Sequence, residues 1–235
     1  MKQLIYSIVT KKPVGISDGK YWIEEADGLL VDKLVVKHHY SHKSTNRFLS
    51  FLVCGQQGFL QLGYGIRPHE KHTISKLITK DNYCEFDRMW LSDDLPKYSE
   101  SRVIGLLLSY LKQVYKRIQF IITYADGSVG NVGTIYKATN AIVTGKFPVD
   151  FYLLTSGERV HPVSMWHRHK SRAIKLLKEL YPGIIHITDN FQYRYLYILS
   201  RKMRKQYYID KRSEVADDYN IGSQLSSDNF EDILI

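Results

Sequence analysis

One stretch of the sequence combines a strand, a polar loop and a helix start. Residues 86–91 have the pattern of a strand, and after a polar loop a helix opens on Ser99, Glu100, Ser101 and Arg102. A strand that leads by a loop into a helix N-terminus commonly holds an anionic ligand, because the first backbone N–H groups point at it. We therefore predict a donor-binding corner at these four residues. Helix capping, with Ser99 as N-cap, is the alternative interpretation.

A second group of reactive side chains lies in the segment KHHYSH, residues 37–42. His39 can take a proton at neutral pH, and Tyr40 can stack on an aromatic ring or hydrogen-bond to it. The alternative is a histidine pair that only decorates the end of a helix, where positive charge is favourable. Both interpretations stay open.

Asp126 is the third candidate, and our first choice for a catalytic residue. It lies where an apolar strand opens into a turn at Gly127, and functional sites are often built at strand ends. The alternative is a turn aspartate that bonds to its own backbone. A transition ion held by His39, Tyr40 and Asp126 is chemically reasonable, but the spacing of these groups along the chain does not support it.

The C-terminal third combines tyrosines with basic residues. Tyr193, Tyr195 and Tyr197 share one face of a strand by two-residue alternation, which suits stacking on unpaired bases and also suits packing in a sheet. Arg88 lies mid-strand, where its charge needs a partner such as Asp87 or a ligand phosphate. The predicted DNA-binding residues are Arg88, Tyr193, Arg194, Tyr195, Arg201, Lys202, Arg204 and Lys205, with the basic segment 167–172 beside them.

The elements that position these groups follow from hydrophobic periodicity. Apolar residues at helical spacing predict a long helix over about 99–118, and a hairpin is predicted around the turn 55–58. A second hairpin is predicted around Ser156 and Gly157, followed by one basic helix over 167–183. The order β-α-β-β-β-α-β-α-β-β-β-α-β predicts an α+β single domain with a mixed central sheet and flanking helices, spanning 1–212, and a disordered tail at 213–235.

Charge and composition narrow the class of protein. The chain of 235 residues has a formal charge of +9, and its end from Glu214 contains six acids and no base, which leaves +15 on the remainder. Such a body attracts polyanions, nucleic acid first among them. We see no apolar run of membrane-spanning length and no signal peptide, and the two cysteines form no disulfide framework. We therefore predict a cytoplasmic protein without a membrane partner.

Several separated segments resemble one family. RMWLSDDLPKYSESRVIG, FIITYADG with GTIYKATN, and QYRYLYILSRKMRKQY resemble, in this order, the Mom family of phage-encoded DNA-modification proteins, and KHHYS is similar to that family's early His-Tyr-Ser segment. The resemblance runs from about Leu34 to about Tyr208. It implies a fold similar to GNAT-type N-acetyltransferases. It also implies that the protein adds an acetamido (carbamoylmethyl) group to the exocyclic amine of adenine in DNA, which protects the DNA from restriction enzymes.

The resemblance also implies roles for the candidate residues. The implied partner is double-stranded DNA with a flipped adenine, and the implied location is the cytoplasm of a phage-infected or host bacterium. Asp126, Tyr40 and His39 would be the catalytic groups. The donor stays open between acyl-coenzyme A and another small-group donor, because Glu100 lies where a phosphate would approach and acetyl transfer would not join the group through its methylene carbon. A route assisted by a transition metal such as iron is a further alternative. A non-catalytic nucleic-acid-binding protein on the same fold, and an N-acetyltransferase for proteins or small molecules, are the competing functions.

Overall fold

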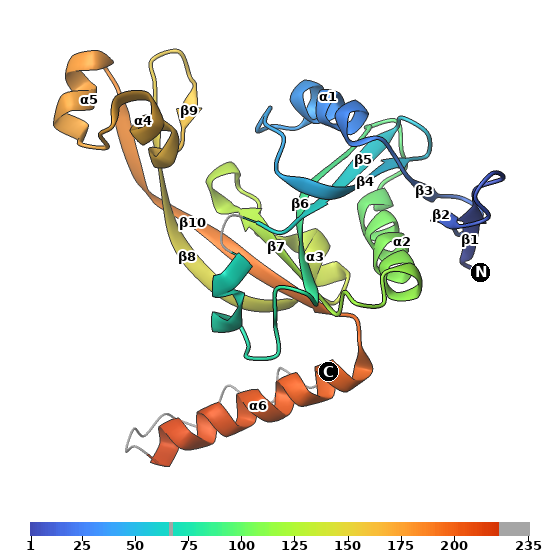
Figure 1. Ribbon diagram of the computed structural model, residues 1–235. Coiled ribbons are helices and arrows are strands. Elements are labelled where there is room, and N and C mark those ends of the chain that lie inside the picture. The colour runs from blue at the N-terminus through green and yellow to red at the C-terminus, as the bar shows by residue number, and fades with distance from the viewer. Residues whose placement is uncertain (66–67, 221–235) are drawn as a thin grey trace.

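The computed structural model describes residues 1–65 and 68–220 (Figure 1). Within them the strands form one mixed sheet in the order β1-β2-β3-β4-β5-β6-β7-β10-β8-β9. The strands are β1 Gln3–Tyr6, β2 Pro13–Ser17, β3 Trp22–Glu25, β4 Arg47–Val53, β5 Gly58–Gly63, β6 Tyr83–Leu91, β7 Phe120–Asp126, β8 Ile142–Leu153, β9 Arg159–Val160 and β10 Ile185–Ile198. The α-helices are α1 Gly28–His38, α2 Ser99–Val114, α3 Thr134–Ala138, α4 Pro162–His169, α5 Ile174–Leu180 and α6 Arg201–Asn220, with short 3-10 turns η1 Pro68–Thr73 and η2 Gly127–Val129.

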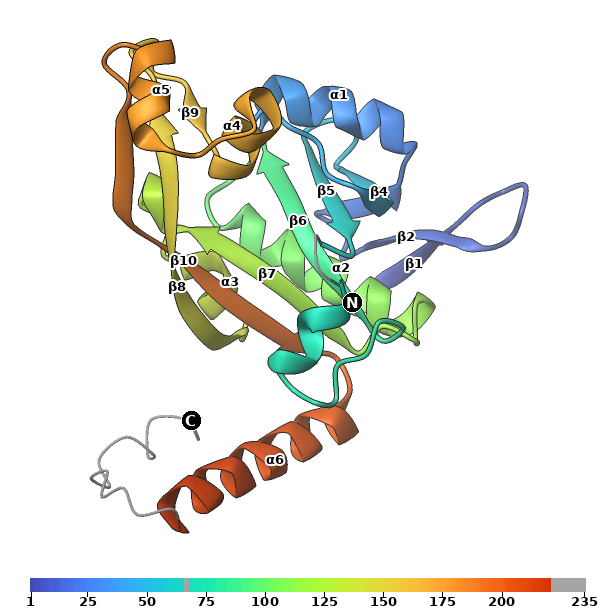
Figure 2. The same cartoon turned by 60° about the vertical axis from the view of Figure 1, so that its left-hand side comes forward.

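Strands β6 and β7 are parallel, because helix α2 carries the chain back across the sheet between them. Their pairing runs from Tyr83 opposite Phe120 to Phe86 opposite Thr123 and ends there, although β6 continues to Leu91 and β7 to Asp126. The carboxyl-terminal halves of the two strands therefore diverge, as Figure 2 shows. The divergence leaves a gap in the middle of the sheet. Side chains from the carboxyl-terminal ends of both strands can meet at this gap.

Strand β6 also has an irregularity against β5. Phe86 pairs with Leu62 and Arg88 pairs with Gln61, so Asp87 is an extra residue without an opposite partner in this ladder. Such a β-bulge turns the strand and re-aims the side chains next to it. The bulge lies at the point where β6 begins to leave β7.

Helices cover both faces of the sheet near this opening. Alternate residues of β5 point to opposite faces: Leu60 and Leu62 pack in the main core with α2, while Phe59 packs against Val31 and Val35 of α1. The apolar positions of α2 are fully buried in the main core, which explains why the pattern in the sequence predicts this helix so clearly. The end of α1 and the start of α2 thus both lie near the carboxyl end of β6.

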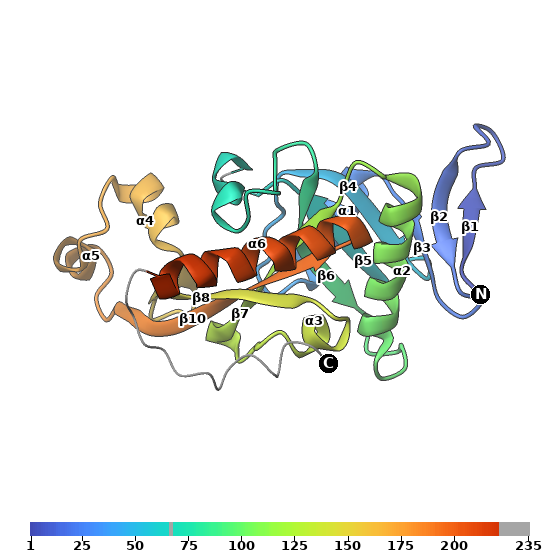
Figure 3. The same ribbon diagram turned by 90° about the horizontal axis from the view of Figure 1, so that it is seen from below.

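A two-stranded arm extends the sheet at one side (Figure 1). Strands β8 and β10 pair along most of their lengths and carry β9, α4 and α5, which have a small apolar cluster of their own. The chain then enters α6, where Tyr207 is buried with Leu196 and Ile198, and the rest of this helix extends away from the sheet below β8 and β10, as Figure 1 shows. Figure 3 gives the view from that side. Among the described residues, every helix is too short or too polar to cross a membrane.

The architecture confirms the predicted mixed α+β sheet with flanking helices. Strands β2 and β3 and helix α6 were not predicted, and the two strands predicted before the turn at 156–157 are one strand, β8. The predicted basic helix over 167–183 is two helices, because Lys170 adopts a left-handed conformation (φ 55°) that ends α4. Helix α6 continues to Asn220, past the predicted start of the tail at 213, and residues 221–235 lie outside the described part of the chain.

Candidate functional site

Two of the three predicted catalytic residues meet where β6 and β7 diverge. Tyr40 follows α1 and is 59% exposed, and Asp126 is the last residue of β7. Partial desolvation of the Tyr40 hydroxyl and the negative charge of Asp126 raise the pKa of this phenol, while the positive charges of Arg88 and Arg159 oppose the shift. Charged side chains from β6, β7 and β9 therefore act on one hydroxyl group.

His39 lies beside Tyr40, with ring centroids 4.3 Å apart, and is 6% exposed. Its Nδ1 accepts a hydrogen bond from the backbone N–H of Ser41 at 3.1 Å, so the neutral ring carries its proton on Nε2. Burial and the positive charges of Arg88 and His42 lower the pKa of His39 to about 4. The prediction that His39 takes a proton at neutral pH is therefore wrong. At that pH it can only donate a hydrogen bond from Nε2.

Asp126 has the local hydrogen bond that a turn aspartate makes. Its Oδ1 accepts from the backbone N–H of Ser128 at 2.9 Å and caps η2. Arg159 of β9 donates to the hydroxyl and carbonyl oxygens of the same Ser128, at 3.1 and 2.9 Å, which anchors the arm to this turn. The turn interpretation is thus confirmed. The negative charge of Asp126 also acts on the Tyr40 hydroxyl, so the carboxylate lies near the site.

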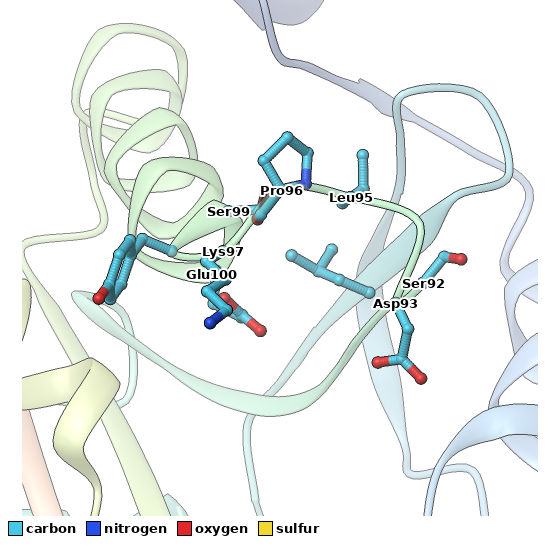
Figure 4. Close-up of a pocket in the computed structure, with 9 residues that line it drawn as sticks. Ser92, Asp93, Leu95, Pro96, Lys97, Ser99 and Glu100 are labelled. Carbon is cyan, nitrogen blue, oxygen red and sulfur yellow. Dashed lines mark hydrogen bonds between the residues drawn. The ribbon is translucent and has the colours of Figure 1, made fainter.

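The predicted donor-binding corner is a pocket of about 340 Å³ between the end of β6 and the start of α2 (Figure 4). Ser99 and Glu100 line it together with Asp93 and Lys97. Ser99 is not the N-cap as predicted: Tyr98 takes that position with φ 70°, and the Ser99 hydroxyl is buried against Tyr21 and Pro96.

The other two residues of the predicted corner lie outside this pocket lining. The Ser101 hydroxyl donates to the Tyr98 carbonyl at 3.0 Å, and the Arg102 guanidinium lies over the Tyr21 ring at 6.0 Å. The lining therefore contains two carboxylates, Asp93 and Glu100, and one ammonium group. This donor set does not fit the pyrophosphate of an acyl-coenzyme A, because the net charge is negative.

The ligand types that a transition metal prefers are scattered in this site. Within residues 1–65 and 68–220, His, Cys, Asp and Glu side chains form no group of three that could hold a metal ion. The Nδ1 of His39 is occupied by Ser41, and its Nε2 carries a proton. The transition metal therefore stays a prediction.

A larger cleft of about 880 Å³ lies over β6, β7 and β10 and was not predicted from the sequence. Its lining is Thr45, Asn46, Gly65, Lys71, Thr73, Ile74, Glu85, Asp87, Arg88, Tyr124, His161, Val163, Gln192 and Arg194. The signal for it was present in the segment CEFDRMW, because two acids at two-residue spacing on a strand, Glu85 and Asp87, are expected on one face. Arg88 belongs both to this cleft and to the surroundings of Tyr40, so the two sites are adjoining.

As a group, the predicted DNA-binding tyrosines are not exposed for stacking with a DNA base. Tyr195 is fully buried against Tyr136, and its hydroxyl donates to the Val132 carbonyl at 2.6 Å. Tyr193 is only partly buried, but it packs on the edge of the same main core. The face that the three tyrosines share thus points into the core, and the prediction that Tyr195 binds DNA is wrong.

The predicted basic residues are better placed than the tyrosines to contact DNA. Arg194 points to the opposite face of β10, lines the cleft, and holds its guanidinium 4.7 Å from the Phe147 ring. Arg88 also lines the cleft and donates from Nε to the Lys43 carbonyl at 3.1 Å. The residues exposed at the start of α6 are Arg201, Lys202, Arg204 and Lys205. These positions stay predictions for contacts with DNA.

A sheet that divides over a polar cleft, with ionisable groups from several elements at its edge, is a typical architecture of an enzyme site. Residues 20–214 match the model of the Mom protein family, and the chain belongs to that family. It is 29% identical over 201 residues to the methylcarbamoylase mom of Escherichia phage Mu, covering 82% of this chain and 81% of that protein.

Solved structures similar to the chain include acetyltransferases. A probable GNAT-family acetyltransferase from Chromobacterium violaceum is 8% identical, with a TM-score of 0.45, over 83% of this chain and 89% of that one. A putative phosphinothricin N-acetyltransferase is 8% identical, with a TM-score of 0.41, over 77% of this chain and 100% of that one.

Proposed function

We propose that the protein is a phage-type DNA-modifying transferase that adds a carbamoylmethyl group to the exocyclic amine of adenine. The observation that carries the proposal is the meeting of Tyr40, Arg88 and Asp126 at the rim of the 880 Å³ cleft, in a chain of the Mom family. The phage Mu relative is named a methylcarbamoylase, which supports the transfer of a small group that contains an amide.

The chemistry of the substrate explains which groups such a site needs. The exocyclic amine of adenine is a poor nucleophile, because its lone pair is delocalised into the ring, and in a duplex it is paired and stacked. An enzyme must extrude the base and hold the amine next to a proton acceptor. The Asp126 carboxylate can accept an N–H of that amine, while the exposed Tyr40 ring can stack on the base and its hydroxyl can hydrogen-bond to it. His39 can donate from Nε2 to a carbonyl oxygen of the incoming group.

Charge supports DNA as the partner. Residues 1–213 carry a formal charge of +15, and basic side chains lie exposed along the first turns of α6. Such a surface attracts the phosphate backbone without reading sequence. A group on the exocyclic amine changes the donor pattern that the major groove displays at adenine, which would protect the DNA from restriction enzymes.

The test is nucleoside mass spectrometry on plasmid DNA from bacteria that express the wild type, Asp126→Asn or Asp81→Asn. Asp81 is an exposed residue before β6 and serves as a matched control. We expect a heavier adenosine from the wild type and the control, with a mass increment equal to a carbamoylmethyl group, and at least a tenfold loss with Asp126→Asn. Unmodified DNA from the wild type would overturn the function. Equal modification by all three would leave the function and refute the role of Asp126.

A further inference from the structure

The floor of the large cleft contains charged groups whose role the proposed chemistry does not use. Glu85 of β6 is 6% exposed and forms an ion pair with Lys71 of η1. Lys71 also lies 5.8 Å from the centre of the Tyr124 ring and 3.4 Å from its hydroxyl. Burial alone would lower the pKa of Lys71, but the hydrogen bond and charge of Glu85 outweigh it and raise that pKa. The ammonium of Lys71 therefore stays charged next to Glu85 in a largely desolvated place, which is costly to build.

Asp87 lies beside this pair at the bulge of β6. Its Oδ2 accepts from the Thr45 hydroxyl at 3.3 Å, and it faces the cleft together with Glu85. Burial and the negative charge of Glu85 raise the pKa of Asp87 to about 7, with Arg88 acting against the shift. At neutral pH the carboxyl group therefore carries a proton for a large part of the time.

The backbone around the two acids is shaped to admit them. A Cβ at Gly63 would lie 2.3 Å from Asp87 Oδ2, and a Cβ at Gly65 would lie 2.2 Å from the carboxylate of Glu85. Only glycine leaves this space, and Gly65 also has φ +70°. Gly63, Gly65 and the bulge at Asp87 thus allow two carboxyl groups to lie in the cleft. They lie next to Arg88, which links the cleft with Tyr40.

The walls of the cleft suit a flat, polar ligand. Tyr124 and Arg194 are opposite each other on β7 and β10, and Arg194 bonds to Thr144 while its guanidinium lies over Phe147. Aromatic rings and guanidinium planes are the groups on which unpaired bases stack. The volume of about 880 Å³ is in the range of pockets that enclose a ligand of nucleotide size.

We propose that this floor is the pocket that recognises the base, in which the carboxyl group of Asp87 pairs with the adenine edge where the amine adjoins a ring nitrogen. This inference rests on the proposed function and names the part of the site that holds its substrate. A protonated carboxyl group accepts from the amine N–H through its C=O and donates its O–H to N1 or N7. Burial and the negative charge of Glu85 favour the form of Asp87 that can do both, while the positive charge of Lys71 opposes it.

The first test measures how tightly the protein holds an unpaired adenine. The probes are a short duplex with one adenine opposite an abasic site and the same duplex with abasic sites in both strands, followed by fluorescence anisotropy at neutral pH. A good bidentate base contact is worth on the order of tenfold or more in affinity. We expect the wild type and Asp81→Asn to bind the adenine duplex about tenfold more tightly than the abasic one. Asp87→Leu, which removes both the donor and the acceptor at similar size, should bind both duplexes within about threefold of each other.

A second experiment uses only the wild-type protein. Replacing the unpaired adenine by 1-deazaadenine or 7-deazaadenine removes one ring acceptor at a time, and one of the two should lower wild-type affinity to near that of the abasic duplex. An Asp87→Leu protein that keeps the tenfold preference, a wild type without preference, or two analogues that bind like adenine would each overturn the pocket. Modified adenosine in wild-type cells would still support the proposed function in those cases.

Discussion

The hydroxyl of Tyr40 is the exposed group on which charges from β6, β7 and β9 converge. Tyr40→Phe removes only this oxygen, and the ring already lies at the surface, so the fold should lose little stability, within about 0.5 kcal/mol. We expect modification of plasmid DNA to fall at least tenfold while the melting temperature stays close to that of the wild type. Nucleoside mass spectrometry and calorimetry on the same preparation check both. A variant that modifies DNA normally would show that the ring alone matters.

Two residues in the site should make opposite contributions to stability between pH 4 and 7. The folded-state pKa of His39 is depressed to about 4, so its contribution is present above the unfolded value of 6.5 and is lost as pH falls toward 4. The folded-state pKa of Asp87 is raised to about 7, so its contribution is present below the unfolded value of 3.8 and is lost as pH rises through 7. The two terms largely cancel in the wild type.

Variants of each residue should therefore reveal the two pH-dependent contributions to stability. We expect His39→Gln to become more stable than the wild type as pH falls from 6.5 to 4, relative to their difference at pH 8. Asp87→Asn should gain relative stability as pH rises from 4 to 8, because it removes a carboxylate that is costly to ionise. Each change should amount to roughly 3 kcal/mol across its window. Urea unfolding at several pH values measures it, and parallel curves for all three proteins would refute the assignments.

Single residues also show what the sequence could predict. The positions of Asp126 and Tyr40 were predictable because a strand end and a helix end are visible in the pattern of residues; their catalytic role stays a prediction. Tyr195 was misplaced because alternation shows which residues share a face but not which face the helices cover. Lys71 and Glu85 were missed as a pair because their partnership depends on a fold between distant segments.

At the scale of elements, Asp32 connects helix α1 with the sheet and with the loop that carries the site. It pairs with Arg47 of β4 at 2.8 Å, accepts from the Gln61 amide at 2.8 Å, and accepts from the Ser44 hydroxyl in the loop after α1. These bonds fix the path of residues 39–46, which begin with His39 and Tyr40. Asp32 is therefore a positioning residue for the site.

Asp32→Asn should loosen this loop without touching the substrate. It removes the charge that Arg47 requires, so we expect a loss of about 1–3 kcal/mol in stability and faster hydrogen exchange in residues 39–46. Modification of DNA should fall as residues 39–46 lose their protection against hydrogen exchange. The neighbouring exposed residue provides the control, since Lys33→Gln changes a charge on α1 but should change neither quantity. Faster exchange spread over the whole chain would instead indicate a general loss of stability.

The elements themselves were predictable to different degrees. Helix α2 and the β4–β5 hairpin follow from periodicity and turn residues, and the structure confirms both. The divergence of β6 from β7 and the bulge at Asp87 have no local pattern, because both are set by how three strands pair. The cleft depends on that divergence, and this is why the sequence indicated the catalytic edge but not the pocket beside it.

At the scale of the whole molecule, opposite charges are separated along the chain. The body is strongly basic, while residues 221–235 contain Asp228, Glu231 and Asp232 and no base. An acidic segment tethered to a basic surface competes with the phosphates of DNA for that surface. Since α6 continues to Asn220, a deletion that begins at 221 keeps this helix intact and takes the formal charge from +9 to +12.

We expect the deletion of 221–235 to strengthen binding to a non-specific duplex by a few fold at moderate salt, with the difference shrinking as salt rises. Anisotropy titrations at several salt concentrations measure both the affinity and its salt slope. A full-length variant with Asp228→Asn, Glu231→Gln and Asp232→Asn separates charge from length: if charge is the cause, it binds like the deletion. Affinities equal to the wild type in both proteins would show that the acids do not reach the DNA-binding surface.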